Sequence, residues 1–160
     1  MLEVENESTV AASIGATWAA ISGFENYRRW HPYVIIEGLA GLGEVVGYSF
    51  QAQSPQAKRW TVEGQVTEFE LERRLTISVG FRYLGLEETY SISPLANGVR
   101  IVHGLRFTGV LTVLGLPAIK RNLAKLLTVE DRCLVQHIAV GSGRKSVRHA
   151  VPHKRNSASK

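Results

Sequence analysis

The sequence contains one cysteine, Cys133, among its 160 residues. A single thiol cannot form a disulfide within the chain and offers no cluster of metal ligands, so we expect Cys133 to be a small apolar residue on a buried helix. A glycine-rich phosphate loop, a serine nucleophile elbow and a His-Glu-x-x-His zinc motif are also missing. The sequence therefore predicts neither a metal nor a cofactor.

Long apolar runs are missing as well. Glu3, Glu5 and Glu7 interrupt the N-terminal residues, which argues against a signal peptide. The most apolar segment, residues 105–119, contains an arginine and a proline and is too short to span a bilayer. We expect a cytoplasmic protein with no transmembrane segment, and 160 residues, 44% of them hydrophobic, suffice for one compact domain.

Acidic residues are absent from residues 141–160, which contain six of the 19 lysines and arginines. Residues 1–140 contain the other 13 basic residues and all 14 acidic ones, so this part of the chain is close to neutral. The Gly, Ser, Lys, Arg and His content of the last segment is typical of disorder. We therefore predict a folded domain of residues 1–140 and a basic tail of residues 141–160. The tail is either a solvated extension or a device for weak contact with anionic lipid or RNA.

Residues 13–32 predict two short helices separated by a tight break. Ser13 is a suitable N-cap for the first helix, Gly23 ends that helix, and Pro32 stops the second, so that His31 already leaves it. We expect His31 to have a local capping or packing role. The aromatic residues expected to pack between these helices and the rest of the protein are Trp18, Phe24 and Trp30.

Alternation of apolar and polar residues predicts strands over residues 45–52, 60–69, 75–83, 86–93 and 99–107. Turn-forming residues at 53–55, 84–85 and 94–98 separate them. Apolar residues three or four apart then predict one helix over residues 117–140, with Pro117 in its first turn and Gly141 just past its end.

An inward Trp on the first helix, a Phe-Glu-Asn-Tyr sequence and a Trp-x-Pro sequence stand here as Trp18, residues 24–27 and residues 30–32. This pattern, with the order of elements, resembles the START-like SRPBCC superfamily of birch-pollen-allergen proteins, lipid-transfer domains and polyketide cyclases. The resemblance implies an α+β helix-grip fold, in which a curved seven-stranded antiparallel sheet wraps around a long C-terminal helix. Two short helices would follow the first strand, over residues 4–10, and a further strand would cover residues 33–37. Members share no catalytic set, so the resemblance assigns no active-site residue.

The strand register locates polar groups on the covered face of this sheet. A tight turn at Leu84-Gly85 would pair Val79 with Tyr90, and the next hairpin would place His103 opposite either Tyr90 or Glu88. Either way, Glu88, Tyr90 and His103 are neighbours. Burying a carboxylate and an imidazole is costly without partners. These groups therefore either satisfy each other, or a water, at the cavity rim, or they contact a ligand and move protons.

Two functions follow from this arrangement. The first is binding of a hydrophobic small molecule, such as a lipid, an isoprenoid quinone or a polyketide, in a cavity between sheet and helix. The second is a cofactor-independent cyclase, aromatase or dehydratase, with Glu88 or His103 as acid or base and Tyr90 donating to an enolate oxygen. A ribosome- or partner-associated protein that uses the tail is a third possibility, and the chain would be a monomer or a homodimer.

Glu130 lies beside the apolar stripe of the long helix and is expected to face the cavity. The predicted ligand-binding residues are Tyr48, Phe50, Trp60, Val79, Phe81, Tyr83, Ile101, Leu105, Phe107, Ile119, Leu123 and Leu127.

Overall fold

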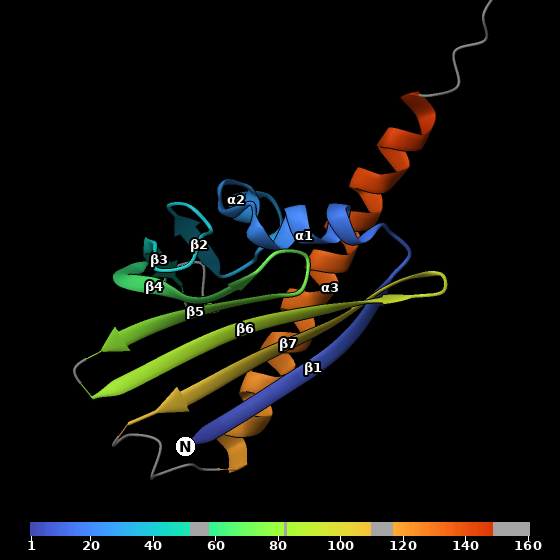
Figure 1. The fold of residues 1–160 in the computed structure, drawn as a ribbon. Coiled ribbons are helices and arrows are strands. Elements are labelled where there is room, and N and C mark those ends of the chain that lie inside the picture. Colours follow the sequence, from blue (N-terminus) through green and yellow to red (C-terminus); the bar gives the residue numbers. More distant parts are fainter. Residues whose placement is uncertain (52–57, 82, 110–116, 149–160) are drawn as a thin grey trace, which may run out of the picture.

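The computed structural model describes residues 1–51, 58–81, 83–109 and 117–148. These residues form seven strands, two short helices near the N-terminus with a 3-10 helix between them, and one long C-terminal helix (Figure 1). In chain order the elements are β1 (Leu2–Val10), α1 (Ile14–Ser22), the 3-10 helix (Phe24–Asn26), α2 (Tyr27–Trp30), β2 (Val34–Glu37), β3 (Val45–Phe50), β4 (Trp60–Glu70), β5 (Arg74–Phe81), β6 (Leu84–Leu95), β7 (Gly98–Thr108) and α3 (Pro117–Arg148).

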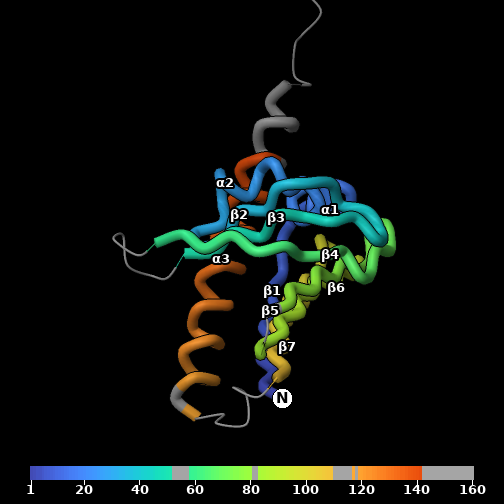
Figure 2. Tube along the Cα trace, turned by 90° about the vertical axis from the view of Figure 1, so that its left-hand side faces the viewer, coloured from blue at the N-terminus to red at the C-terminus, as the bar shows by residue number. Residues whose placement is uncertain are grey.

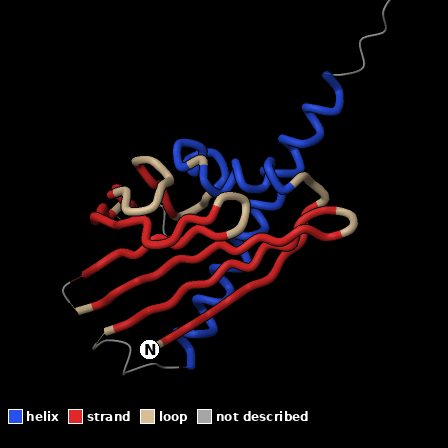
Figure 3. Tube along the Cα trace, viewed as in Figure 1, coloured by secondary structure: helices blue, strands red, loops and turns tan. Residues whose placement is uncertain are grey.

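The seven strands make one antiparallel sheet in the order β1-β7-β6-β5-β4-β3-β2. The helices α1 and α2 are inserted in the chain between the two strands that form the edges of this sheet (Figure 3). The sheet is curled, and α3 runs along its concave face, in contact with β1 (Figure 2). This arrangement confirms the predicted α+β helix-grip fold. In the part of the chain that is described, no helix has the length and apolar content needed to cross a membrane.

The two short helices begin and end where their residue types predict. The Ser13 hydroxyl oxygen accepts a hydrogen bond from the Ala16 amide at 3.2 Å, which caps α1, and Gly23 follows the last residue of that helix. The backbone of His31 is extended, so α2 ends just before Pro32. Local sequence signals alone therefore fix this helical pair.

Aromatic side chains of the helical pair fill one end of the core. Trp18 packs edge-on against Phe69 of β4, with 5.5 Å between the ring centroids. Tyr27 lies between Phe24 and Trp30, at centroid distances of 5.7 Å and 4.7 Å. These rings belong to the same apolar cluster as the inward side chains of the central strands, so the helical pair is part of the main core.

The hairpin between β5 and β6 differs from the prediction. Leu84 and Gly85 are the first two residues of β6 and not its turn, because Phe81 pairs with Leu84 and Val79 pairs with Leu86. Gly85 suits a strand here, since a Cβ atom at this position would lie 2.6 Å from the Thr108 hydroxyl oxygen of β7. The register moves by an even number of residues, so the predicted inward residues still face inward.

The long helix also differs from the prediction, because α3 continues to Arg148 and does not end at Val140. Its last turns project beyond the sheet (Figure 1). A glycine inside a helix costs only about 1 kcal/mol relative to alanine, so Gly141 is not a sufficient stop signal. Residues 141–148 of the predicted tail are therefore helical. Residues 149–160 and the predicted turn at 53–55 lie outside the described residues, and the division into domain and tail remains a prediction.

Candidate functional site in the cavity between sheet and α3

A cavity of about 400 Å³ lies between the sheet and the first half of α3. Its wall is mostly apolar and comes from β2, β3, β6, β7 and α3. The lining residues are Tyr33, Val34, Tyr48, Phe50, Gln51, Leu84, Leu86, Glu88, Leu105, Phe107, Leu123, Leu126 and Glu130. The cavity therefore lies between the inward-facing side chains of four strands and one face of α3.

Glu88 of β6 is the most strongly bonded polar group of this wall. Its Oε2 atom accepts a hydrogen bond from the Tyr48 hydroxyl group at 2.7 Å, and its Oε1 atom accepts one from the Tyr90 hydroxyl group at 3.0 Å. The His103 Nε2 atom lies 3.2 Å from the same Oε1 atom. The side chain is 1% exposed, so protein groups rather than water satisfy its two oxygens.

The bonded chain continues from Glu88 through His103 to α3. The His103 Nδ1 atom lies 2.8 Å from the Asp131 Oδ1 atom, and the Asn6 side-chain amide donates to Asp131 Oδ2 at 2.6 Å. The His103 ring also stacks on Tyr90, its partner across the β6–β7 ladder, at a centroid distance of 4.0 Å. We call these groups the Glu88–His103–Asp131 network. It ties α3 to β1, β6 and β7 behind the cavity wall.

The charges in this network stabilise one another. Burial raises the pKa of Glu88, but the hydrogen bond and charge of His103 outweigh that effect and lower it to about 2. Burial lowers the pKa of His103, but the hydrogen bonds that its ring donates to Asp131 and Glu88, together with their charges, outweigh that effect and raise it to about 10. At neutral pH the network is therefore an imidazolium ion between two carboxylates.

Glu130, the neighbour of Asp131 on α3, lines the cavity and has a different environment. The basic group nearest to its carboxyl group is the His31 ring. The His31 Nε2 atom lies 3.8 Å from Glu130 Oε1, which is too far for a hydrogen bond. Burial raises the pKa of Glu130 to about 8; the charge of His103 opposes this shift, and the charges of Glu88 and Asp131 add to it. At neutral pH Glu130 is therefore a carboxylic acid that can donate a proton.

His31 packs behind Glu130 as a neutral imidazole. Its Nδ1 atom accepts hydrogen bonds from the Tyr33 and Val34 amides at 3.3 Å and 3.1 Å, which confirms the predicted local capping role. A ring nitrogen that accepts carries no proton, so the proton is on Nε2. Burial lowers the pKa of His31 to about 4, which keeps the ring neutral at physiological pH. Its Nε2 atom is buried without a hydrogen-bond partner among the described residues.

The structure distributes the predicted ligand-binding residues over three environments. Side chains on the cavity wall are Tyr48, Phe50, Leu105, Phe107 and Leu123. Val79, Ile101 and Leu127 are fully buried in the core instead, because the strand and helix periodicities give the covered face but not the position of the cavity along it. Trp60, Tyr83 and Ile119 are 59%, 60% and 45% exposed, since they lie at the start of β4, in the β5–β6 turn and in the first turn of α3. The Phe81 side chain lies outside the described part.

The predicted acid–base group of Glu88, Tyr90 and His103 is brought together in the structure, with His103 opposite Tyr90. Of these three, Glu88 lines the cavity, while Tyr90 and His103 lie behind it. Sequence reasoning missed Asp131 and Asn6. Asp131 lies one helical turn after the buried Leu127 on α3, and Asn6 lies two positions after the buried Val4 on β1. The helical and strand periodicities therefore place both side chains on inward faces. Among the described residues, no group of three or more His, Cys, Asp and Glu side chains could hold a metal ion.

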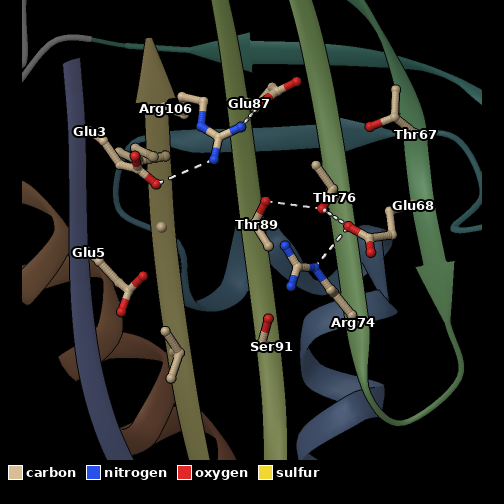
Figure 4. Close-up of a pocket in the computed structure, with 13 residues that line it drawn as sticks. Glu3, Glu5, Thr67, Glu68, Arg74, Thr76, Glu87, Thr89, Ser91 and Arg106 are labelled. Carbon is tan, nitrogen blue, oxygen red and sulfur yellow. Dashed lines mark hydrogen bonds and ion pairs between the residues drawn. The ribbon is translucent and has the colours of Figure 1, made fainter. Parts of the chain in front are cut away.

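A second hollow, of about 650 Å³, lies on the opposite face of the sheet (Figure 4). Most of its charged side chains are paired with one another: Arg106 with Glu3 and Glu87, and Arg74 with Glu68. Because both arginines of this hollow are already paired with carboxylates, on a face turned away from α3, the cavity under α3 is the better candidate site.

Comparison with known proteins agrees with this geometry. Residues 1–130 match the sequence model of the family described as polyketide cyclase / dehydrase and lipid transport. No curated protein matches the chain by sequence.

Three solved structures illustrate the shared fold. A START superfamily protein from Mycobacterium smegmatis is 19% identical, with a TM-score of 0.69 over 85% of this chain and 96% of its own. A protein from Chromobacterium violaceum is 14% identical, with a TM-score of 0.69 over 87% and 99%. The di-domain ARO/CYC StfQ of the steffimycin biosynthetic pathway is 11% identical, with a TM-score of 0.67 over 91% of this chain and 52% of its own. At these identities the likeness concerns the fold.

Proposed function

Because the chain belongs to the polyketide cyclase / dehydrase and lipid transport family, we propose that it binds a hydrophobic small molecule in the cavity between the sheet and α3. The observation that carries the proposal is the cavity itself, about 400 Å³ in volume and enclosed mainly by aliphatic and aromatic side chains. Ligand sites in proteins commonly have volumes of about 300–1,000 Å³ and such walls. Lipids, isoprenoid quinones and polyketides are candidate ligands.

The polar part of the wall supports binding more than it supports proton transfer. Both oxygens of Glu88 already accept hydrogen bonds, and a carboxyl group with a pKa of about 2 is a weak base. His103 is 0% exposed and is bonded through both ring nitrogens. Affinity in such a site comes from the apolar surface that the ligand removes from water.

The binding proposal is tested by filling the cavity. We expect the neutral dye Nile red to bind the wild-type protein and Leu123→Trp to weaken that binding at least tenfold, because the larger side chain occupies the space. Leu42→Trp is the matched control, since Leu42 is 70% exposed, and it should leave binding unchanged. If the wild type does not bind Nile red, or if both variants bind it equally well, the proposal is wrong.

A second candidate function is a cofactor-independent cyclase, aromatase or dehydratase. The observation that favours it is a group of ionisable residues at an apolar cavity, in which Glu130 has a pKa of about 8, close to the working range of a general acid or base. In that mechanism Glu88 or His103 would act as acid or base and Tyr90 as donor to a developing enolate oxygen. With a substrate in hand, Glu88→Gln and His103→Ala should each lower turnover at least tenfold and leave binding largely intact. Normal turnover by both variants would exclude this mechanism.

A further inference from the structure

One carboxyl group on the cavity wall forms no hydrogen bond within the described part of the chain. It belongs to Glu130 of α3, which lines the cavity together with Leu123 and Leu126. We propose that Glu130 is the group that exchanges a proton with a bound apolar molecule, by taking the proton of an acidic C–H bond. This inference names the acid–base residue of the second candidate function, and it rests on the proposed binding of an apolar molecule in the same cavity.

The position of Glu130 on α3 directs its carboxyl group at the space for a ligand. Leu123, Leu126 and Glu130 are three and four residues apart, so they lie on one face of the helix. The Glu130 side chain is 4% exposed, and neither of its oxygens is fully buried, unlike the Nε2 atom of His31. A molecule in the cavity can therefore contact this carboxyl group without contacting His31.

The other acid–base groups near the cavity are already hydrogen-bonded. Both oxygens of Glu88 accept hydrogen bonds, the shorter one from the Tyr48 hydroxyl group at 2.7 Å. The His103 ring is 0% exposed and is held between Glu88 and Asp131. A proton enters or leaves this network only when a buried hydrogen bond breaks, and that step is costly. Glu130 is therefore the wall group best placed to take a proton.

Glu130 is also a stronger base than an ordinary carboxylate. Burial raises its pKa to about 8; the charge of His103 opposes this shift, and the charges of Glu88 and Asp131 add to it. The strength of a general base increases with its pKa. The ionised form of Glu130 is therefore a better proton acceptor than Glu88, whose pKa is about 2.

The groups around Glu130 do not give its carboxylate form a cation of its own. The titratable side chains that face it or feel its charge come from α2, β3, β6, β7 and α3 and from residues 31–33. They are Tyr27, His31, Tyr33, Tyr48, Glu88, Tyr90, His103 and Asp131. Burial lowers the pKa of His31 to about 4, so this ring stays neutral, and His103 is shared between two other carboxylates. The ionised Glu130 is therefore a poorly solvated base.

The proposed step can be measured with 5-nitrobenzisoxazole, a small, planar and neutral carbon acid. The Glu130 carboxylate takes the proton of the C–H bond next to the ring nitrogen. The electron pair of that bond completes a nitrile group, and the N–O bond breaks with its electron pair on oxygen. The product, 2-cyano-4-nitrophenolate, contains every atom of the substrate except that proton, and its yellow colour reports the rate. Glu130 then releases the proton to water, so the cycle needs no further reactant.

Substitutions assign the rate to one carboxyl group. At about pH 9 we expect the full-length wild type to catalyse this elimination and Glu130→Gln to lower kcat at least tenfold, with KM and the affinity for Nile red largely unchanged. Glu130→Asp should retain part of the rate, because it keeps a carboxylate at this position. Glu68→Gln is the matched control, since Glu68 lies on the opposite face of the sheet (Figure 4), and it should keep the wild-type rate.

A pH series on the wild type identifies the base without a substitution. After subtraction of the rate in buffer, kcat should rise with pH and level off above about 8, because only the ionised form of Glu130 accepts a proton. A kcat that is constant between about pH 5 and pH 9 would indicate Glu88, whose pKa is about 2. A kcat that still rises through about pH 10 would indicate His103. Either of these profiles overturns the inference.

Binding of Nile red separates failure of this inference from failure of the binding function. If the wild type binds Nile red but eliminates no faster than Glu130→Gln, the inference is wrong and the binding function stands. If the wild type does not bind Nile red, the proposed function is wrong and this inference falls with it.

Discussion

Glu130 and Asp131 are adjacent in the sequence, yet their carboxyl groups have opposite environments. Asp131 bonds to His103 and Asn6, whereas Glu130 faces the cavity and lies near the uncharged ring of His31. A cation is available to one carboxyl group and not to the other. At the scale of single residues, the site is therefore one paired ionic network beside one neutral acid.

The neutral acid makes stability depend on pH. The pKa of Glu130 is about 8 against an ordinary value of 4.5, so between these values the folded protein keeps a proton that the unfolded chain releases. Stability contributed by this group is complete below about pH 4.5 and is lost as pH rises towards 8. Gln cannot ionise, so we predict that Glu130→Gln raises the melting temperature at pH 8 and changes it little at pH 5. Each kcal/mol of stability regained at pH 8 should raise the melting temperature by about 2–4 °C.

Thermal melts of both proteins from pH 5 to pH 8 measure this difference. Glu68→Gln is a suitable control, because Glu68 lies on the outer face of the sheet and pairs with Arg74. A gain from Glu130→Gln that is the same at every pH would show that Glu130 is ionised in the folded protein.

Residue-level predictions from the sequence succeed where one periodicity decides them. Strand alternation brings Glu88, Tyr90 and His103 together on one face, and the structure confirms that they are neighbours. Asp131 and Asn6 were missed because Asp131 of the helix reaches His103, and Asn6 of the edge strand reaches Asp131, only after the chain has folded over the sheet. Local pattern gives the face on which a group lies, but not its partner from a distant element.

At the scale of elements, the helical pair is the clearest link between sequence and packing. Trp18 is 5% exposed and contacts Phe69 edge-on, so α1 is fastened to β4 through one large side chain. Ser13 caps the start of this helix and Gly23 follows its last residue, as their residue types predict. The β5–β6 turn, by contrast, was misplaced, because Leu84-Gly85 resembles a turn locally while Gly85 fits against Thr108 of the next strand.

Removing the Trp18 side chain should therefore destabilise the whole domain. We predict that Trp18→Ala lowers the free energy of unfolding by about 3–5 kcal/mol, the cost of truncating a buried aromatic residue. Trp60→Ala is the matched control, since Trp60 is 59% exposed, and its effect should stay within about 0.5 kcal/mol. Urea unfolding of the three proteins gives both values. Equal effects of the two substitutions would mean that α1 does not pack as described.

The length of α3 leads to a prediction about Gly141. Inside a helix, Gly141→Ala should favour the helical state by about 0.5–1 kcal/mol, and the space around this position is open. Amide exchange of residues 141–148 should slow in this variant. If exchange there becomes faster, Gly141 terminates the helix in solution and the shorter helix of residues 117–140 is correct.

At the scale of the whole molecule, the curled sheet and α3 enclose a cavity whose wall and polar network come from both ends of the chain. The order of elements was predictable, because the helical pair, the alternating strands and the long apolar stripe each leave a local pattern. The position of the cavity was not predictable. Val79 and Ile101 face inward like Leu105, yet only Leu105 lines the cavity, while Val79 and Ile101 are buried in the same core cluster as the aromatic side chains of the helical pair.

The basic end of the chain should be separable from this cavity. Ile138 is the last buried residue described on α3, so a protein that ends at Val140 should keep its melting temperature and its affinity for Nile red. We predict that any affinity of the full chain for anionic vesicles falls steeply with added salt and disappears on truncation, because residues 141–160 carry six basic residues and no acidic one. Vesicle sedimentation with both proteins measures this. Salt-insensitive binding that survives truncation would place the membrane contact on the folded domain.

The central claim is that a hydrophobic molecule enters the cavity under α3. Methyl-labelled leucine NMR tests it most directly, because Leu86, Leu105 and Leu123 line the cavity while Leu42 is 70% exposed on the surface. On titration with methyl octyl ketone, we predict saturable shifts of the three cavity leucines and none of Leu42. Unchanged cavity resonances, or shifts confined to surface methyl groups, would contradict the account.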